Sequence, residues 1–317
     1  MVVLAPRMGL VLHPRRDCSG AVGQVASWTA THGVTLLAAE DDVARLGLRG
    51  VTSVSRDELA AASDALIALG GDGTLLGAMR LVADRSGPVP VLGVNLGRLG
   101  FLAEVEGRDL DSALEAVAEG RATTETRACL VVRHDDAEHL AFNDAVLARV
   151  PGAGLVEATM SVAGQPYGHY KCDALILATP MGSTAYNYAA GGPVVSPGAA
   201  GVLVTPSAPL NGIARSLLLG PSEWLTLELT AGSPAVELDG VLSGRLEPGA
   251  VVEVSLRPDA GRLVRIEGSQ AAARSRVKLS LLDLPVLPQE LVELLPPAMR
   301  ERMAAPDGAA PLPTEQQ

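Results

Sequence analysis

Short apolar runs alternate with stretches of helical spacing along the first hundred residues. The apolar runs lie at residues 8–12, 34–38, 65–69 and 89–94, and the helical spacing lies at residues 20–32 and 74–83. Strands that alternate with helices in this way form parallel βαβ units, whose ligands bind at the carboxyl ends of the strands. The pattern therefore predicts an α/β domain with a parallel sheet over residues 1–107.

The pattern changes after Gly100. Residues 110–119 still have helical spacing, but beyond them short β-rich runs are separated by Gly, Pro and Asp. These runs lie at residues 130–132, 145–148, 158–162, 175–178, 202–204, 224–229 and 251–256. Many short strands at regular spacing are typical of an all-β domain. We therefore expect a second, mainly β domain over residues 108–272 and a disordered tail over residues 305–317.

Length and composition agree with two globular domains. The chain has 317 residues, of which 48% are hydrophobic and 19% are charged, so it has enough apolar side chains for sizeable cores. The net charge is −11, and no basic stripe occurs in the sequence. Because nucleic acid and anionic membrane surfaces select clustered Lys and Arg, neither is an expected partner.

One long segment carries no charge at all. Residues 174–214 are 41 residues without a charged side chain, and they are interrupted by five prolines. A lipid-facing helix could not satisfy its backbone with that many breaks, so the segment indicates a site built from loops. Full exposure would leave a large apolar patch, so we expect a homo-oligomer with residues 186–193 at or near the interface.

The cysteines indicate a reducing compartment. Cys18, Cys129 and Cys172 are widely spaced and odd in number, so they predict no disulfide framework. The first apolar run is interrupted and followed by arginines instead of being preceded by positive charge, which argues against a signal peptide. We expect a cytoplasmic protein.

The sharpest local motif is Gly70-Gly71-Asp72-Gly73-Thr74, between an apolar run and a stretch of helical spacing. Three glycines let backbone N–H groups approach an anion, and a helix N-terminus adds a favourable dipole. A carboxylate is unfavourable in a phosphate cradle unless it has a task. Asp72 is therefore expected to accept a hydroxyl proton or to hold a metal ion. The alternative is a tight turn with an aspartate cap.

A second group of candidates surrounds a Gly-Ser-Thr loop at residues 182–184. All four tyrosines lie within residues 167–188, which indicates either stacking on a planar ligand or ordinary core aromatics. Lys171 is one of only two lysines in the chain. Its ammonium could meet a phosphate or pair with the neighbouring Asp173.

Two polar pairs have both a functional and a local interpretation. Asn143-Asp144 could present an amide and a carboxylate to one ligand, or could form an Asx turn. The stretch between His134 and His139 resembles a metal cluster, but it lies between two apolar runs and is interpreted as a solvated hairpin tip.

Taken together, these motifs resemble the NAD kinase family. The matching motifs are Gly70 to Thr74, Asn95-Leu96-Gly97, Gly100-Phe101-Leu102, Asn143-Asp144, Asp173, Thr179-Pro180, Gly182 to Tyr186, Gly191-Gly192-Pro193, Thr205-Pro206 and Asp239-Gly240. Their order and spacing follow the family from about residue 8 to residue 270. The resemblance implies an α/β N-terminal domain, a β-rich NAD-binding domain, and a C-terminal segment, residues 273–304, that returns to the first domain.

The resemblance also implies a reaction, the transfer of a phosphoryl group from ATP or polyphosphate to the 2′-hydroxyl of the adenosine ribose of NAD, which gives NADP. Asp72 matches the acidic residue that accepts the hydroxyl proton, and Mg²⁺ would accompany ATP. The other implied site residues are Gly71, Gly73, Asn143, Asp144, Lys171, Asp173, Thr184, Ala185, Tyr186, Asn187 and Ala189. A neighbouring subunit of a dimer or tetramer would complete the pocket. Phosphoryl transfer depends mainly on positioning and charge neutralisation, which a Gly-rich backbone and Mg²⁺ can supply.

Two alternatives stay open at this point. A non-catalytic dinucleotide-binding homologue would carry the same motifs, and departures from the family pattern, among them Met181 for Thr and Asp144 for Glu, permit it. A lipid kinase shares the GGDG loop but needs a hydrophobic acceptor pocket or a membrane-binding surface, against which the acidic net charge argues. Product formation from ATP and NAD separates the kinase from the non-catalytic homologue.

Overall fold

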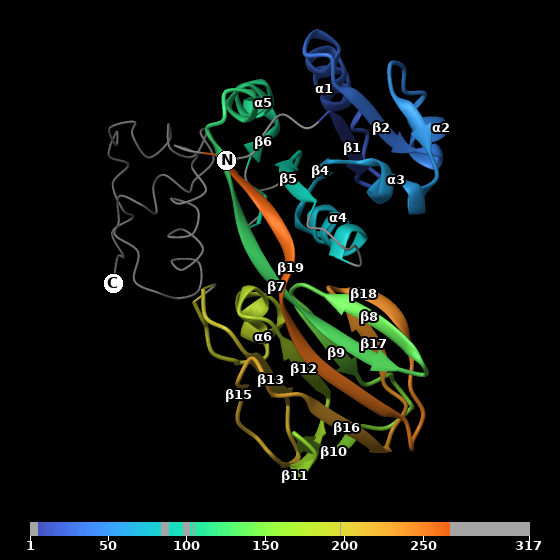
Figure 1. The fold of residues 1–317 in the computed structure, drawn as a ribbon. Helices are drawn as coiled ribbons and strands as arrows, with labels where there is room; N and C mark the ends of the chain where they lie inside the picture. The colour runs from blue at the N-terminus through green and yellow to red at the C-terminus, as the bar shows by residue number, and fades with distance from the viewer. Residues whose placement is uncertain (1–5, 84–88, 98–101, 104, 197, 267–317) are drawn as a thin grey trace, which may run out of the picture. The chain divides into compact units, whose positions relative to one another are not determined.

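The computed structural model describes residues 6–83, 89–97, 102–103, 105–196 and 198–266 (Figure 1). By its internal contacts the chain separates into two units, Met1–Ala271 and Ala272–Gln317. The expected C-terminal segment, residues 273–304, and the expected tail, residues 305–317, lie outside the described residues.

The N-terminal part is an α/β domain, as the alternating pattern predicts. Its elements are β1 (Arg7–Leu12), α1 (Ser19–Thr31), β2 (Thr35–Ala39), α2 (Glu40–Leu46), β3 (Thr52–Val54), α3 (Arg56–Ala62), β4 (Ala65–Gly70), α4 (Asp72–Ala83), β5 (Pro90–Asn95), β6 (Val105–Glu106), η1 (Gly107–Asp109) and α5 (Leu110–Ala118). The strands are parallel in the order β3-β2-β1-β4-β5, with β6 beside β5. The strand order therefore reverses direction between β1 and β4.

Helices cover both faces of this sheet. On one face, Leu10 of β1 shares a core with Trp28 of α1 and Leu114 of α5. On the other face, Val11 shares a core with α3 and α4, including Met79. Successive strand residues point to opposite faces, so a strand buried on both faces reads as a continuous apolar run. This is why the strands were predictable from short apolar runs.

Two short helices are not predicted by the sequence pattern. The seven-residue helices α2 and α3 are too short to show a helical period. Helix α3 nevertheless has a clear start signal, because the Ser55 side chain accepts from the backbone N–H of Glu58 while the Glu58 carboxylate accepts from the Ser55 N–H. This reciprocal pair is a capping box.

The second part is mainly antiparallel β-structure, as expected. Its elements are β7 (Ala122–His134), β8 (Ala137–Ala141), β9 (Asp144–Ala148), β10 (Val156–Val162), β11 (Gln165–Cys172), β12 (Ala174–Ala178), η2 (Met181–Thr184), α6 (Tyr186–Ala189), β13 (Val202–Ser207), β14 (Asn211–Gly212), β15 (Leu217–Leu219), β16 (Leu225–Ala231), β17 (Ala235–Leu238), β18 (Val241–Arg245) and β19 (Val251–Ile266). One sheet has the order β15-β13-β12-β9-β17-β18. Its inner residues share one core with the strands around β10, β16 and β19.

A long ribbon joins the two parts. The 16-residue strand β19 pairs antiparallel with β7 along most of its length, and its end pairs parallel with β5, with Leu263 opposite Val91 (Figure 1). Helix α5 follows the predicted boundary at residue 107, yet its buried side chains pack in the α/β core. Trp28 also donates to the Glu115 carboxylate of α5 at 2.7 Å.

The stretch between His134 and His139 forms the hairpin expected from its position. Strands β7 and β8 are joined by Asp135 and Asp136, whose φ angles are +50° and +61°. Two successive positive φ values are typical of the mirror-image turns that connect tight hairpins.

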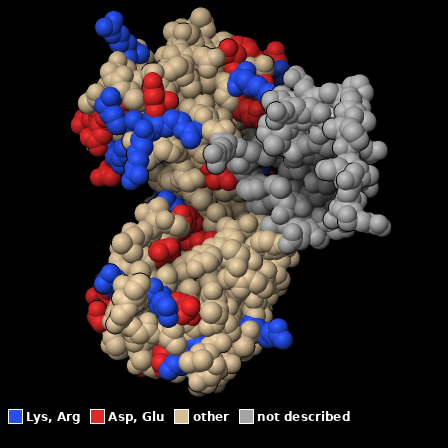
Figure 2. Space-filling model, turned by 180° about the vertical axis from the view of Figure 1, so that it is seen from behind, with Lys and Arg blue, Asp and Glu red and all other residues tan. Residues whose placement is uncertain are grey.

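Charged and uncharged surface are unevenly distributed. On the face in Figure 2, basic and acidic side chains are interspersed over the α/β part, and large areas of the β part carry neither. Exposed apolar side chains occur in or just after the uncharged segment, at Tyr186, Val194, Leu210 and Leu218. Among the described helices, none is both long enough and apolar enough to cross a membrane.

Candidate active site

The glycine-rich turn lies where the strand order reverses. Strand β4 ends at Gly70, and α4 begins at Asp72, so the turn occupies the carboxyl end of a strand beside the β1–β4 switch point. Ligands of open α/β sheets bind at this position. The backbone N–H groups of Thr74 and Leu75 donate to the Gly71 carbonyl at 3.0 and 3.1 Å, which closes the first turn of the helix.

Different constraints explain the glycines at the three positions of the turn. A Cβ on Gly70 would overlap the Thr74 side chain, so packing excludes any larger residue there. A Cβ on Gly71 or Gly73 would meet nothing within 4 Å, and neither residue has a positive φ. The fold itself therefore does not require glycine at these two positions. Glycine there leaves the backbone open to close approach by another group.

Asp72 is held by the chain that follows β5. Its Oδ1 accepts a hydrogen bond from the Leu102 N–H at 3.0 Å. Asn95 stands opposite Gly70 in the β4–β5 register, and the Leu96 N–H donates to the Gly70 carbonyl at 2.7 Å. The sequence motif at residues 95–97 thus lies against the glycine turn, whereas Gly100 and Phe101 lie outside the described residues.

The Asn143-Asp144 pair is fixed by a distant carboxylate instead of a local Asx turn. Asp239 Oδ1 accepts from the backbone N–H groups of Asn143 at 2.7 Å and Asp144 at 3.3 Å, and Asp239 Oδ2 accepts from the Phe142 N–H at 3.2 Å. The side-chain oxygen of Asn143 is buried without a hydrogen-bond partner. Buried polar atoms in proteins are nearly always paired, so this oxygen is a candidate ligand-binding atom.

Asp144 is an unusual carboxyl group. It is 4% exposed. Burial, together with the negative charges of Asp239 and Glu237, raises its pKa to about 7, although a hydrogen bond from the Tyr186 backbone N–H acts in the opposite direction. The Asp144 carboxyl therefore lies next to the start of α6.

The loop after β12 packs directly on Asn143. The Thr179 N–H donates to the Asn143 carbonyl at 2.9 Å, and the Thr179 hydroxyl donates to the Phe142 carbonyl at 2.6 Å. A Cβ on Gly182 would overlap the Asn143 carbonyl, which explains the glycine at that position. The Thr184 hydroxyl beyond it is buried without a partner. The structure thus brings this loop and the Asn143-Asp144 pair together, as the motifs predict.

The residues that follow have distinct environments. Tyr186 and Ala189 are exposed, and Ala185 is partly exposed. Asn187 is fully buried, and its amide donates to the carbonyls of Ser183 and Pro193 and accepts from the Thr205 hydroxyl. Asn187 therefore holds the loop in shape through its side chain.

Lys171 and Asp173 lie at the other end of β12. Asp173 precedes this strand and Thr179 follows it, so about 20 Å separates them. Lys171 pairs with Glu157 on the neighbouring strand, and Asp173 pairs with Arg149 at 3.1 Å. Of the two alternatives for Lys171, a phosphate or the Asp173 carboxylate, the structure does not show the pairing with Asp173. A single chain does not bring these two residues to the Asn143-Asp144 pair.

Sequence reasoning missed one connection. The Arg80 guanidinium of α4 forms an ion pair with Asp239, whose side chain is fully buried. Asp239-Gly240 is one of the motifs shared with the family, and an Asp-Gly pair between two β-rich runs predicts a hairpin turn, but neither signal indicates a contact with Arg80. Tyr170 agrees with the core interpretation of the tyrosines, since it is a buried residue of the β part, and its buried hydroxyl has no partner among the described residues.

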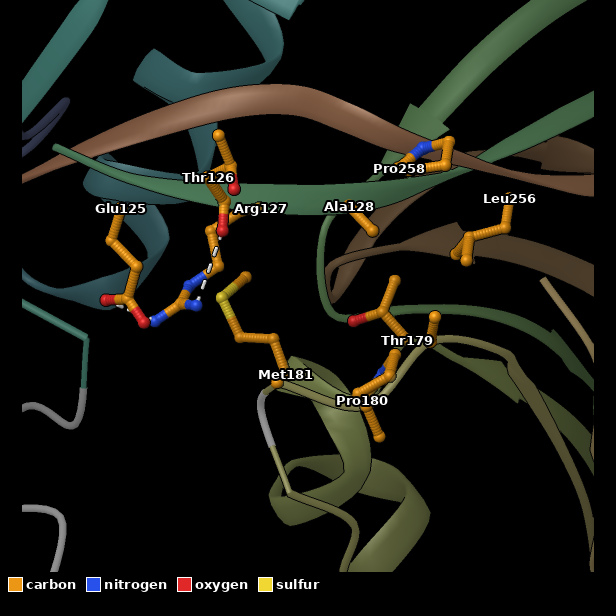
Figure 3. Close-up of a pocket in the computed structure, with 12 residues that line it drawn as sticks. Glu125, Thr126, Arg127, Ala128, Thr179, Pro180, Met181, Leu256 and Pro258 are labelled. Carbon is orange, nitrogen blue, oxygen red and sulfur yellow. Dashed lines mark hydrogen bonds and ion pairs between the residues drawn. The ribbon is translucent and has the colours of Figure 1, made fainter.

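A pocket of about 290 Å³ adjoins this region (Figure 3). Thr179, Pro180 and Met181 form one wall, and residues 125–128 of β7 form another, with Arg127 and Met181 pointing toward each other. Arg127 is 10% exposed and pairs with Glu125 at 2.7 Å. The pocket lining thus combines apolar side chains with the ion pair of Arg127 and Glu125.

The donor set offers no cage for a metal ion. Within the described ranges, His, Cys, Asp and Glu side chains form no group of three that could hold one. Magnesium is usually held by one or two carboxylates together with substrate phosphates, for which a single aspartate beside a phosphate-binding turn is suitable.

These features define a class of protein. A glycine turn at the switch point and a fixed aspartate at the start of its helix form an arrangement in which α/β proteins bind nucleotide phosphates, as a nucleotide phosphotransferase requires. Arg80 and Asp239 join this helix to the Asn143-Asp144 loop. Residues 10–122 match the ATP-NAD kinase N-terminal domain, and residues 142–266 match the ATP-NAD kinase C-terminal domain. The chain belongs to the ATP-NAD kinase family.

Curated relatives and solved structures agree with this assignment. NAD kinase 1 of Streptomyces avermitilis is 36% identical over 97% of this chain and 98% of its own length. The NAD kinase of Symbiobacterium thermophilum is 42% identical over 68% of this chain and 78% of its own length. Yeast NADH kinase, solved with NADH, has the same fold at a TM-score of 0.79 and 22% identity, covering 89% of both chains. An Archaeoglobus fulgidus NAD kinase, solved with ATP, has a TM-score of 0.63 at 22% identity, covering 86% of this chain and 98% of its own.

Proposed function

We propose that this protein transfers the terminal phosphoryl group of ATP to the 2′-hydroxyl of the adenosine ribose of NAD, which gives NADP. The proposal rests mainly on the β4–α4 turn. Gly71 and Gly73 adjoin open space, and the fold does not require glycine at either position, so another group can approach the backbone there. Backbone N–H groups in such a turn bind phosphate oxygens, and the N-terminus of the 12-residue helix α4 adds a favourable dipole. The relatives named NAD kinase support the same reaction.

Asp72 is the general base of the proposed reaction. Its carboxylate lies at the start of α4, and the hydrogen bond from the Leu102 N–H fixes one of its oxygens. A carboxylate within hydrogen-bond reach of the ribose hydroxyl would take the proton as the oxygen attacks the γ-phosphorus of ATP. The bond between that phosphorus and its bridging oxygen breaks, and ADP leaves.

The adenosine of NAD is proposed to bind at the Asn143-Asp144 pair. The orphaned Asn143 oxygen and Thr184 hydroxyl are polar atoms that a ligand can satisfy, and the Asp144 carboxyl lies beside them through its bond from Tyr186. Residues 184–186 and Ala189 are proposed to contact the same ligand, and the hydrogen bonds of Asn187 hold their loop in shape. The pocket in Figure 3 adjoins the pair through Thr179 and adds volume for part of a nucleotide.

Magnesium is proposed to enter with ATP. When bound, it would neutralise phosphate charge during phosphoryl transfer. Asp72 is the side chain that would contact it, since Mg²⁺ keeps most of its ligands as water and phosphate oxygens.

The site is proposed to be completed by a second copy of the chain. Lys171 and Asp173 lie about 20 Å from the Asn143 loop in one chain, so they can serve the pocket only from a neighbour. The exposed, uncharged surface around Tyr186, Val194 and Leu210 is the apolar area such an interface would cover. We infer a homo-oligomer, a dimer or a tetramer.

A reducing, cytoplasmic location is also inferred. Cys18, Cys129 and Cys172 are all buried, and none of them forms a disulfide. Burial raises the pKa of the Cys172 thiol to about 12, which keeps it in the unreactive thiol form.

The test is product formation by the purified chain. NAD and NADH are each incubated with MgATP or polyphosphate, and NADP or NADPH is quantified by mass spectrometry. The Asp72→Asn variant should lose about 10²–10⁴-fold in kcat, as expected for removal of a general base. Asp57→Asn is the matched control, because Asp57 is an exposed aspartate in the first turn of another helix.

The outcomes separate the alternatives. Dinucleotide binding without product from any donor would identify a non-catalytic homologue. An Asp72→Asn variant with wild-type kcat would remove Asp72 from the mechanism. Polyphosphate is a second candidate donor because a backbone cradle contacts phosphate groups and not the adenine base.

A further inference from the structure

The ion pair between Arg80 and Asp239 joins two pieces of the proposed site that are far apart in sequence. Arg80 lies in the last turn of α4, the helix that begins with Asp72. Asp239 lies in the two-residue turn between β17 and β18, with φ of +49°. The pair therefore connects the phosphate-binding helix to the β part of the molecule.

Both carboxylate oxygens of Asp239 bind the backbone around the Asn143-Asp144 pair. The backbone N–H groups of residues 142, 143 and 144 all donate to its two oxygens. Its own backbone N–H donates in return to the Asp144 carbonyl at 2.9 Å. Four polar interactions, including the Arg80 ion pair, thus converge on a side chain with no exposed surface.

The turn itself does not need an acidic residue. Asp239 and Gly240 both have positive φ, as in a mirror-image turn, and asparagine is at least as suitable as aspartate at the first position. The aspartate is instead explained by its two acceptor oxygens and by its charge. Its Oδ2 accepts from the Phe142 N–H and faces the Arg80 guanidinium, while its Oδ1 accepts from the N–H groups of Asn143 and Asp144, so an asparagine would turn its NH2 group toward one of these two sets of donors.

We propose that Arg80 and Asp239 are a positioning pair for phosphoryl transfer. Asp239 fixes the backbone that presents Asn143 and Asp144 to the acceptor, and Arg80 sets that unit relative to the helix that carries Asp72 and the phosphates. The role in catalysis rests on the proposed function. A misplacement of about 1 Å between reacting groups costs up to about 100-fold in rate, so the link affects turnover without touching the substrate.

The pair predicts a split between turnover and affinity. Arg80→Gln removes the link and leaves Asp239 on the Asn143 loop, so kcat should fall about 10- to 100-fold while KM for NAD stays within about threefold. Asp239→Asn loosens the loop itself, so it should lower kcat and raise KM for NAD. Arg80→Lys keeps the charge and should recover part of the lost kcat.

The double variant Arg80→Gln/Asp239→Asn decides whether the residues act together. Its kcat should be no lower than that of the worse single variant, because residues of one interacting pair are not additive. Arg133→Gln is the matched control, since Arg133 forms an exposed ion pair with Glu138 on the β7–β8 hairpin and should leave kcat unchanged. Assays are run well below the melting temperature of each variant.

Hydrogen exchange tests the coupling without relying on activity. Arg80→Gln should speed amide exchange in residues 142–144 as well as in α4, and Asp239→Asn should do the same. Exchange that rises in α4 alone, wild-type kcat in Arg80→Gln, or losses that multiply in the double variant would each overturn the proposal. A wild-type chain that makes no NADP would refute the proposed function, and the exchange data would still decide the coupling.

Discussion

The buried Asp144 carboxyl should make the protein less stable as the pH rises. Its pKa is about 7, against an ordinary value of 3.8, chiefly because burial disfavours the charged form and the charge of Asp239 adds to it. The folded protein holds this proton up to about pH 7, whereas the unfolded chain releases it near pH 4. The free energy of unfolding therefore falls as the pH rises through this range.

The magnitude follows from the size of the shift. A pKa raised from 3.8 to about 7 corresponds to about 4 kcal/mol lost when the group is fully ionised. Between pH 5 and pH 8 the loss is about 2–3 kcal/mol for one group. Asp144→Asn keeps the shape and removes the ionisation. It should therefore stabilise the protein by about 2–3 kcal/mol more at pH 8 than at pH 5.

Urea unfolding followed by circular dichroism at the two pH values measures this difference. Asp136→Asn serves as the control, because Asp136 is an exposed aspartate at a turn with positive φ, which asparagine tolerates equally well. Its effect should be the same at both pH values. A stability change in Asp144→Asn that does not depend on pH would refute the reasoning about burial.

Three further predictions concern the site. The Gly73→Ala variant should have unchanged stability or gain up to about 1 kcal/mol, as a helical Gly-to-Ala change does, but its kcat/KM for ATP should fall at least about 10-fold. The control is Gly23→Ala in α1, which also lies beside open space and should keep full activity. Asn143→Ala should raise KM for NAD by the equivalent of about 1–3 kcal/mol and leave KM for ATP unchanged, and equal affinity would show that its orphaned oxygen faces no ligand. Dilution should lower the specific activity as the subunits separate, and light scattering at each concentration reports the oligomeric state. A fully active monomer would show that Lys171 and Asp173 are not needed from a neighbour.

The sequence predicts those parts of the fold that depend on local pattern. Strands β1, β4 and β5 are apolar on both faces and appear as runs, and helices α1 and α4 are long enough to show a period. Helices α2 and α3 have only seven residues each and show none. The glycine motif predicts its own turn because strand, turn and helix are contiguous.

The contacts that the sequence does not predict depend on pairing between segments that are distant in the chain. Lys171 contacts Glu157 because the β10–β11 register places them opposite each other, and a two-residue change of register would alter that partner. Arg80 and Asp239 are separated by 159 residues. Nothing local to either residue indicates the other, so the connection could be seen only once the two parts were folded.

The proposed site binds anions in an acidic protein, and its own charges explain how. Three aspartates, Asp72, Asp144 and Asp239, belong to the elements of a proposed site that must receive phosphates, in a chain with only two lysines. Arg80 offsets the charge of Asp239, and burial holds the pKa of Asp144 near 7, so this carboxyl is about half protonated at neutral pH. Repulsion of the phosphates is thereby reduced without basic side chains in the cradle. In the proposed mechanism, the backbone of the glycine turn is then sufficient to bind the phosphates, and Asp72 is the carboxylate that would take the proton.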